Sequence, residues 1–142
     1  MILVINGPNL GRLGSREPDI YGTASYDDLV ARCQQTAKEL GEEVDVRQSN
    51  DESELIGWLH EAADNAWPVV INPAAFTHYS YALRDAVVIA RDAGVKVVEV
   101  HLTNPAEREA FRQTSVIAAV ASGTIAGFGL DSYRLALQAV AR

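Results

Sequence analysis

The 142-residue sequence contains one cysteine, Cys33, and so cannot form a disulfide within the chain. Cys33 lies in a helical pattern, where a small buried apolar residue is the simplest interpretation. A chain without disulfides suits a reducing compartment, and we expect the cytosol. The opening residues MILVING carry no basic segment ahead of the apolar run, so we expect no secretory signal.

Long hydrophobic runs and positive charge are also scarce. No apolar run approaches the roughly 20 residues of a membrane-spanning helix. The net charge is -7, without a block of like charges, which argues against nucleic acid or an anionic membrane as the main partner. A small anionic ligand remains compatible with this charge, because a local arginine cluster can override the global field.

Recognisable cofactor motifs are missing as well. Neither GxxxxGK[ST] nor GxGxxG follows an expected strand, so a glycine-rich phosphate loop is not predicted. The three histidines are dispersed and the one thiol lies within a helix, which gives no metal-ligand spacing. We therefore expect neither a metal nor a cofactor.

The residues that are present predict one domain, 1–142, of alternating strands and helices. Hydrophobic residues make up 48% of the chain and charged residues 22%, an ordinary globular composition. Short apolar runs bounded by Asn, Gly and Pro predict strands at 2–5, 44–48, 68–71, 95–100 and 124–127. Helical spacing and capping residues predict helices at 25–40, 51–63, 78–92, 105–111 and 129–141.

This alternation predicts a three-layer α/β/α sandwich. Strands joined by helices form right-handed crossovers and hence a parallel sheet. The expected arrangement is flavodoxin-like, with five strands in the order 2-1-3-4-5. Ligands of such sheets bind at the carboxyl ends of the strands, near the point where the strand order reverses.

Polar residues gather after three of the expected strands. They are Asn9, Arg16 and Tyr21 after the first strand, Asn72 and His78 after the third, and Glu99, His101, Leu102, Thr103, Arg108 and Arg112 at and after the fourth. A glutamate buried in a strand needs a partner, and orienting His101 is the natural use of Glu99. Arg108 and Arg112, four residues apart, are expected to share one helix face. The N–H groups of Leu102 and Thr103 could hold a carboxylate.

Each of these residues also has an ordinary structural interpretation. Asparagine after a strand is common turn chemistry, a tyrosine in a glycine-rich loop can anchor the surface, and His78 could cap its helix. Together, a phenol, an imidazole, guanidinium groups and amides suit acid–base chemistry on an oxygenated anion. Tyr21, with an ordinary pKa of about 10, needs a cation such as Arg16 to act as a base. Residue chemistry alone thus predicts proton transfer on a small polyhydroxy acid.

Four motifs, in order, resemble those of the type II dehydroquinases and cover nearly the whole chain. They are NGPNLGRLGSREPDIYG (6–22), INPAAFTHYSYALRDA (71–86), EVHLTN with REAFR (99–104 and 108–112) and GTIAGFGLDSYRLAL (123–137). The departures from these motifs include Thr103, where serine is commoner, and Ala74-Ala75, which replaces a segment that often contains glycine. Neither removes a catalytic group.

The resemblance implies a dehydration of 3-dehydroquinate through an enolate, without cofactor or Schiff base. Tyr21 would remove the proton alpha to the ketone, and Arg16 would lower its pKa. Asn9 would hold a water against the enolate oxygen, and His101, oriented by Glu99, would protonate the departing hydroxyl. The resemblance assigns substrate binding to Asn72, His78, Leu102, Thr103, Arg108 and Arg112. It also implies a dodecamer built from four trimers, in which Asp85 reaches a neighbouring subunit's site.

Three other functions share parts of this pattern. A flavin-binding protein has the same topology, but it would need a hydroxyl-rich loop where the chain has Asn-Gly-Pro-Asn. A phospho-receiver domain would need acids in the regions where Asn9 and Asn72 stand. A non-catalytic relative would not need Arg16, Tyr21 and His101 together.

Overall fold

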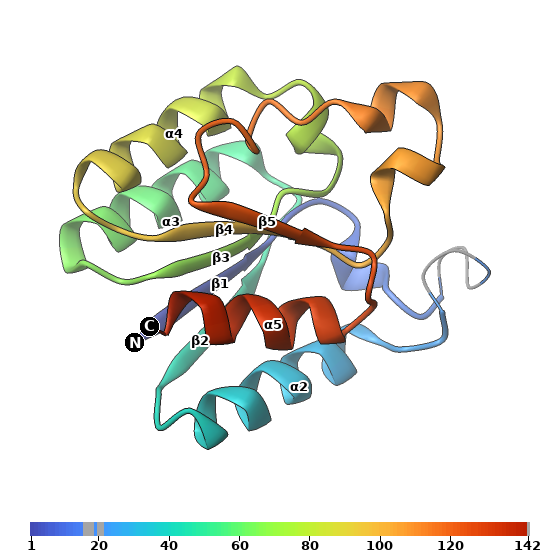
Figure 1. Ribbon diagram of the computed structural model, residues 1–142, viewed down its shortest axis with the longest axis horizontal. Helices are drawn as coiled ribbons and strands as arrows, with labels where there is room; N and C mark the ends of the chain where they lie inside the picture. The colour runs from blue at the N-terminus through green and yellow to red at the C-terminus, as the bar shows by residue number, and fades with distance from the viewer. Residues whose placement is uncertain (16–18, 20–21, 142) are drawn as a thin grey trace.

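Strands and helices alternate along the chain in the computed structural model, which describes residues 1–15, 19 and 22–141 (Figure 1). The strands are β1 (Ile2–Asn6), β2 (Val44–Gln48), β3 (Val69–Asn72), β4 (Val97–His101) and β5 (Gly123–Ala126). The α-helices are α2 (Tyr26–Glu39), α3 (Glu52–Asn65), α4 (Tyr81–Asp92) and α5 (Asp131–Val140). Short 3-10 helices are η1 (Leu10–Arg12), η2 (Ala74–His78), η3 (Pro105–Glu107) and η4 (Ala110–Gln113).

The five strands form one parallel sheet in the order β2-β1-β3-β4-β5. The predicted flavodoxin-like topology is thus confirmed. The strand order reverses between β1 and β3, where Asn6 pairs with Asn72 at the carboxyl ends. Because all strands are parallel, the loops that leave β1, β3 and β4 meet at this same edge of the sheet.

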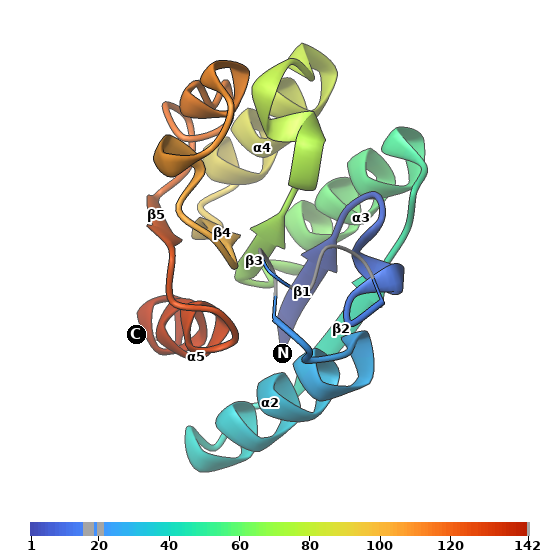
Figure 2. The same cartoon turned by 90° about the vertical axis from the view of Figure 1, so that its right-hand side faces the viewer.

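Helices α2 and α5 cover one face of the sheet, and α3 and α4 cover the other, as Figures 1 and 2 show. Ile2 and Val4 of β1 pack in the core that includes α2 and α5, whereas Leu3 and Ile5 pack in the core that includes α3 and α4. This division follows from the alternation of side chains along a strand. Cys33 of α2 is buried, as expected, and burial raises the pKa of its thiol to about 12.

Side-chain caps define where the helices begin. Ser25 and Asp28 form the predicted capping box of α2, and Asp51 accepts a hydrogen bond from the Ser53 N–H at the start of α3. The prediction that a helix begins at residue 78, with His78 as a possible cap, is wrong. Ser80 caps α4, and the preceding residues form the separate helix η2. No α-helix in the described part of the chain is long and apolar enough to cross a membrane.

The predicted helix at 105–111 is also wrong. Asn104 caps a turn with Pro105 at its first position, as expected, but η3 ends after three residues. Arg108 takes an extended backbone conformation, and a second 3-10 turn, η4, follows. Neither turn has a buried residue, and a helix this short needs an apolar face packed on the protein to persist. Arg108 and Arg112 therefore do not share the face of one helix.

The end of α3 offers a test of backbone strain. Ala66 follows the helix with φ 56° and ψ 40°, a left-handed conformation in which a Cβ costs about 1 kcal/mol. We expect Ala66→Gly to raise the free energy of unfolding by about 0.5–1 kcal/mol, measured by urea denaturation. Gly41, at φ 71° after α2, is the matched control. Gly41→Ala should lower the free energy of unfolding by a similar amount. A destabilised Ala66→Gly protein would contradict this account.

Candidate active site

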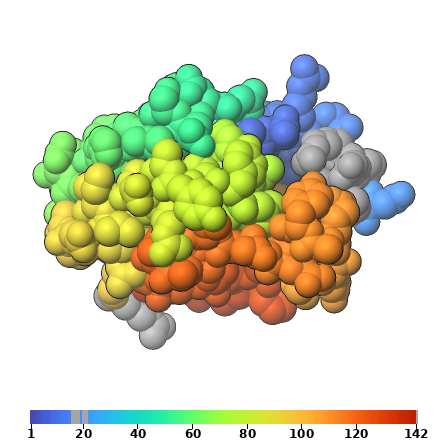
Figure 3. Space-filling model, turned by 90° about the horizontal axis from the view of Figure 1, so that it is seen from above, coloured from blue at the N-terminus to red at the C-terminus, as the bar shows by residue number. Residues whose placement is uncertain are grey.

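A pocket opens at the carboxyl edge of the sheet, where three loops meet. Figure 3 shows the residues after β1 (blue) and the η3–η4 segment (orange) at the same end of the molecule. The pocket is lined by Pro8, Asn9, Leu10, Asn72, Ala74, Ala75, His78, His101, Leu102, Thr103, Pro105, Arg108 and Arg112. Eight residues singled out from the sequence therefore lie together, although the two arginines reach the pocket from separate short turns.

Four predicted site residues are not among the described residues that line this pocket. Glu99 is one of them, although it contacts His101, which does line it. Arg16 and Tyr21 lie outside the described residues, so their placement stays a prediction. Asp85 lies on α4 with its side chain exposed, and it does not line the pocket. Its predicted role in a neighbouring subunit's site likewise stays a prediction.

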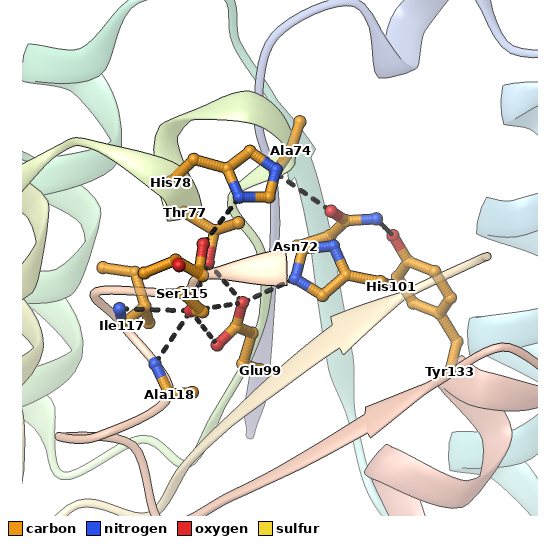
Figure 4. Close-up of polar contacts among 11 residues, drawn as sticks. Asn72, Ala74, Thr77, His78, Glu99, His101, Ser115, Ile117, Ala118 and Tyr133 are labelled. Atoms are coloured by element: carbon orange, nitrogen blue, oxygen red, sulfur yellow. Dashed lines mark hydrogen bonds and ion pairs between the residues drawn. The ribbon is translucent and has the colours of Figure 1, made fainter. Parts of the chain in front are cut away.

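Glu99 and His101 form a close polar pair beside the pocket. They are two residues apart on β4, so both side chains project from the same face of the sheet. Glu99 is fully buried, and its Oε2 lies 2.5 Å from His101 Nε2 (Figure 4). The contact expected for a buried glutamate in this strand is thus present. His101 keeps 12% of its side chain exposed, which leaves it accessible from the pocket.

Hydrogen bonds keep the Glu99 carboxyl ionised in spite of its burial. Burial by itself raises the pKa of this group, but hydrogen bonds from His101, Thr77 and Ser115 and the charge of His101 outweigh burial and hold the pKa below its usual value. An ionised carboxylate only accepts hydrogen bonds, so His101 donates from Nε2. The proton on this nitrogen fixes the tautomer of the neutral ring, with Nδ1 as the acceptor.

The other pocket histidine is also held by its surroundings. His78 Nδ1 lies 2.7 Å from the carbonyl oxygen of Thr114, and because a carbonyl only accepts, Nδ1 carries a proton. The ring of Phe111 meets the His78 ring edge to face, with centroids 5.6 Å apart. Phe111 also lies under the Arg112 guanidinium, whose Nε donates to Glu109 at 2.9 Å. His78 of η2 and the partly neutralised Arg112 of η4 thus lie in one wall of the pocket.

Asn72 takes part in a buried hydrogen-bond network at the base of the pocket. Its Nδ2 donates to the Tyr133 hydroxyl at 2.9 Å, and that hydroxyl donates to Asn6 Oδ1 at 2.6 Å. Asn72 Oδ1 accepts from the Ala74 N–H at 3.0 Å. Tyr133 belongs to α5 and is fully buried, so a helix far along the sequence fixes the rotamer of Asn72.

The loop after β3 has a constrained backbone. Ala74 takes φ 52°, a left-handed conformation that glycine adopts without strain and that the hydrogen bond to Asn72 supports. Gly7 lies against this loop, where a Cβ would come within 2.7 Å of the Pro73 carbonyl oxygen. The replacement of glycine by alanine, noted in the sequence, therefore falls at a position that favours glycine.

Loss of the Tyr133 hydroxyl should destabilise the protein. We expect Tyr133→Phe to lower the free energy of unfolding by about 1–3 kcal/mol, because the buried amide groups of Asn6 and Asn72 lose their shared partner. Urea denaturation measures this change. Tyr79→Phe, at a side chain that is 58% exposed, should change the stability little. Equal stabilities of the two variants would show that the network contributes no net stability.

Sequence reasoning missed three polar residues that organise the site: Thr77, Ser115 and Tyr133. Thr77 precedes His78 in a recognised motif, and the need of buried Glu99 for donors was a signal that could have identified it. Ser115 lies in an irregular segment without a distinctive local pattern. Tyr133, although within the 123–137 motif, lies in an amphipathic helix that does not indicate its partner. Across the ranges that the structure describes, no three His, Cys, Asp or Glu side chains are grouped to hold a metal ion.

A buried carboxylate–imidazole pair beside a polar pocket, at the carboxyl edge of a flavodoxin-like sheet, is the arrangement of an acid–base enzyme. Comparisons with known proteins identify the family. The family model described as "Dehydroquinase class II" matches residues 1–141, and the chain belongs to this family.

Individual relatives cover nearly the whole chain. A 3-dehydroquinate dehydratase of Salinispora tropica is 58% identical over 140 residues, which span 99% of this chain and 96% of the relative. The crystal structure of a type II dehydroquinase from Propionibacterium acnes has a TM-score of 0.94 at 54% identity and covers 99% of this chain and 94% of that one. The type II dehydroquinase structure from Butyrivibrio crossotus has a TM-score of 0.95 at 45% identity, covering 99% and 97%.

Proposed function

We propose that this chain is a hydro-lyase that dehydrates 3-dehydroquinate to 3-dehydroshikimate. The observation that carries the proposal is the Glu99–His101 pair at the wall of the pocket. An imidazole whose far nitrogen is bound to a buried carboxylate can hold a proton for a leaving group. The name of the Salinispora relative, a 3-dehydroquinate dehydratase, agrees with this chemistry.

The proposed reaction is an anti elimination through an enolate. Tyr21, its pKa lowered by Arg16, removes the proton alpha to the ketone, and the electron pair moves onto the carbonyl oxygen. Asn9 holds a water that stabilises this enolate oxygen. His101 then gives its proton to the hydroxyl while the enolate electrons re-form the ketone and make the new carbon–carbon double bond, so the carbon–oxygen bond breaks and the group leaves as water. The tautomer set by Glu99 makes Nδ1 the nitrogen that exchanges this proton.

Binding of the substrate is assigned to the other pocket residues. The backbone N–H groups of Leu102 and Thr103, with the Thr103 hydroxyl, would hold the substrate's carboxylate, and Arg108 and Arg112 would supply positive charge. His78 would bind a substrate hydroxyl through Nε2, because Nδ1 is bonded to a backbone carbonyl.

Asn72 would also bind a substrate hydroxyl. Its amide retains one N–H and one lone pair beyond the bonds to Tyr133 and Ala74.

We further propose that the protein assembles as a dodecamer of four trimers in which Asp85 contacts a neighbouring subunit's site. The exposure of Asp85 on α4 is compatible with such a contact. The cytoplasm is the proposed location, because the one cysteine is a free buried thiol. The reaction would serve either the shikimate pathway or quinate breakdown.

Ultraviolet absorbance tests the proposed reaction. Purified protein mixed with 3-dehydroquinate should produce a rising signal from the conjugated enone, at the same rate with and without a chelator. Borohydride added with substrate should leave the enzyme active, because no imine forms. A flat trace from folded protein would refute the proposed activity, and a covalent adduct with borohydride would refute the enolate mechanism.

A further inference from the structure

The Glu99 carboxylate has hydrogen-bond partners besides His101. Oε2 contacts His101 Nε2 and accepts from the Thr77 hydroxyl, whereas Ser115 Oγ lies 2.9 Å from Oε1 and 3.1 Å from Oε2. Ser115 is the side chain that contacts Oε1 in the described hydrogen bonds (Figure 4).

The direction of the Ser115 hydrogen bond follows from counting donors and acceptors. Ser115 Oγ accepts from the backbone N–H groups of Ile117 at 3.2 Å and Ala118 at 2.9 Å. These two bonds use both lone pairs of the hydroxyl oxygen, so its single proton points away from the two N–H groups. Ser115 therefore donates its hydrogen bond either directly to Glu99 or to Thr77 Oγ1, which is 2.6 Å away. In the second arrangement the Thr77 hydroxyl donates to Glu99. In both arrangements the carboxylate of Glu99 accepts a hydrogen bond from a hydroxyl of Ser115 or Thr77.

Hydrogen bonds fix the segment that carries Ser115 against η2 and α4. The N–H of Val116 donates to the Thr77 carbonyl at 2.7 Å, and its carbonyl accepts from Arg84 of α4 at 2.9 Å. The neighbouring Thr114 carbonyl accepts from His78. Ser115 is thus anchored to the backbone on one side and to the carboxylate on the other.

We infer that Ser115 is a positioning residue for the proton-donating step: it holds the Glu99 carboxylate in the orientation that binds His101 Nε2 and so directs Nδ1 to the substrate. This inference rests on the proposed function for its catalytic consequence only. The other charged or titratable groups that line this pocket are His78, Arg108 and Arg112. The two arginines only donate, and Glu99 is the acceptor that contacts His101 Nε2 in the described hydrogen bonds.

Kinetics of three Ser115 variants test the inference. Ser115→Ala removes the hydroxyl, and we expect kcat to fall about 10- to 100-fold with KM little changed, because slight misplacement of a catalytic group can cost about 100-fold. Ser115→Thr keeps the hydroxyl and should restore most of kcat. Ser115→Cys keeps the size with a weaker donor and should retain the loss. Ser122→Ala is the matched control, since Ser122 Oγ bonds the Val97 N–H away from the pocket.

Nitrogen-15 NMR of the histidine rings provides a readout without substrate. The chain has three histidines, so His101 is assigned by comparison with His101→Gln. Above the pH at which the ring titrates, the wild-type His101 should carry its proton on Nε2, and Ser115→Ala should mix the two tautomers while Ser115→Thr should not.

An unchanged tautomer in Ser115→Ala, or a change in KM with kcat intact, would overturn the role of Ser115. An inactive wild-type protein would instead refute the proposed function, and the tautomer measurement would still decide the role of Ser115.

Discussion

Replacing His101 with glutamine is expected to lower kcat for 3-dehydroquinate by about 100- to 10,000-fold, the usual range for loss of a general acid. Glutamine can still donate to the Glu99 carboxylate, so the buried charge keeps a partner and the fold should persist. KM should change little, because the substrate's carboxylate is assigned to other residues. The initial rate of enone formation measures the effect.

His60→Gln is the matched control for this substitution. His60 is exposed on α3, so its loss should leave the rate unchanged. If His101→Gln retained wild-type kcat, the proton for the leaving group would have to come from another residue, and the Glu99–His101 pair would be structural.

Replacing Tyr21 with phenylalanine is expected to have an effect at least as large, with kcat about 1,000-fold lower or more, since the proposed base is removed. Substrate binding should persist, because the phenol is not assigned to binding. The measurement is kcat by enone absorbance, together with Kd from calorimetric titration of the variant.

Tyr81→Phe is the control for the tyrosine substitution. Its side chain is 67% exposed on α4, and we expect turnover to be unaffected. Comparable rates for Tyr21→Phe and the wild type would remove Tyr21 from the mechanism and require another base.

The sequence was sufficient to predict the fold because its local patterns agree. Apolar strands such as Val69–Asn72 alternate with helices that have clear caps at Ser25 and Asp51. The errors fall where packing is weak or capping residues compete. The segment after Asn104 has a strong helix-start signal but no buried face, and Ser80 rather than His78 begins α4.

Individual contacts within the candidate site were predictable only where short spacing fixes their geometry. Glu99 and His101 are two residues apart on a strand, so their contact follows from the alternation of side chains. The contacts of Ser115 with Glu99 and of Tyr133 with Asn72 join residues 16 and 61 positions apart. Such pairs depend on how the layers meet, which a single sequence does not specify.

The hydrogen bond between Tyr133 and Asn6 joins residues 127 positions apart and so has a consequence for synthesis in the cell. A chain emerging from the ribosome can pair β1 with β2 and β3 early, but Asn6 and Asn72 remain without this buried partner until α5 has emerged. Nascent chains should therefore carry an incomplete pocket floor for most of translation. Competence to bind substrate would arise only when α5 docks.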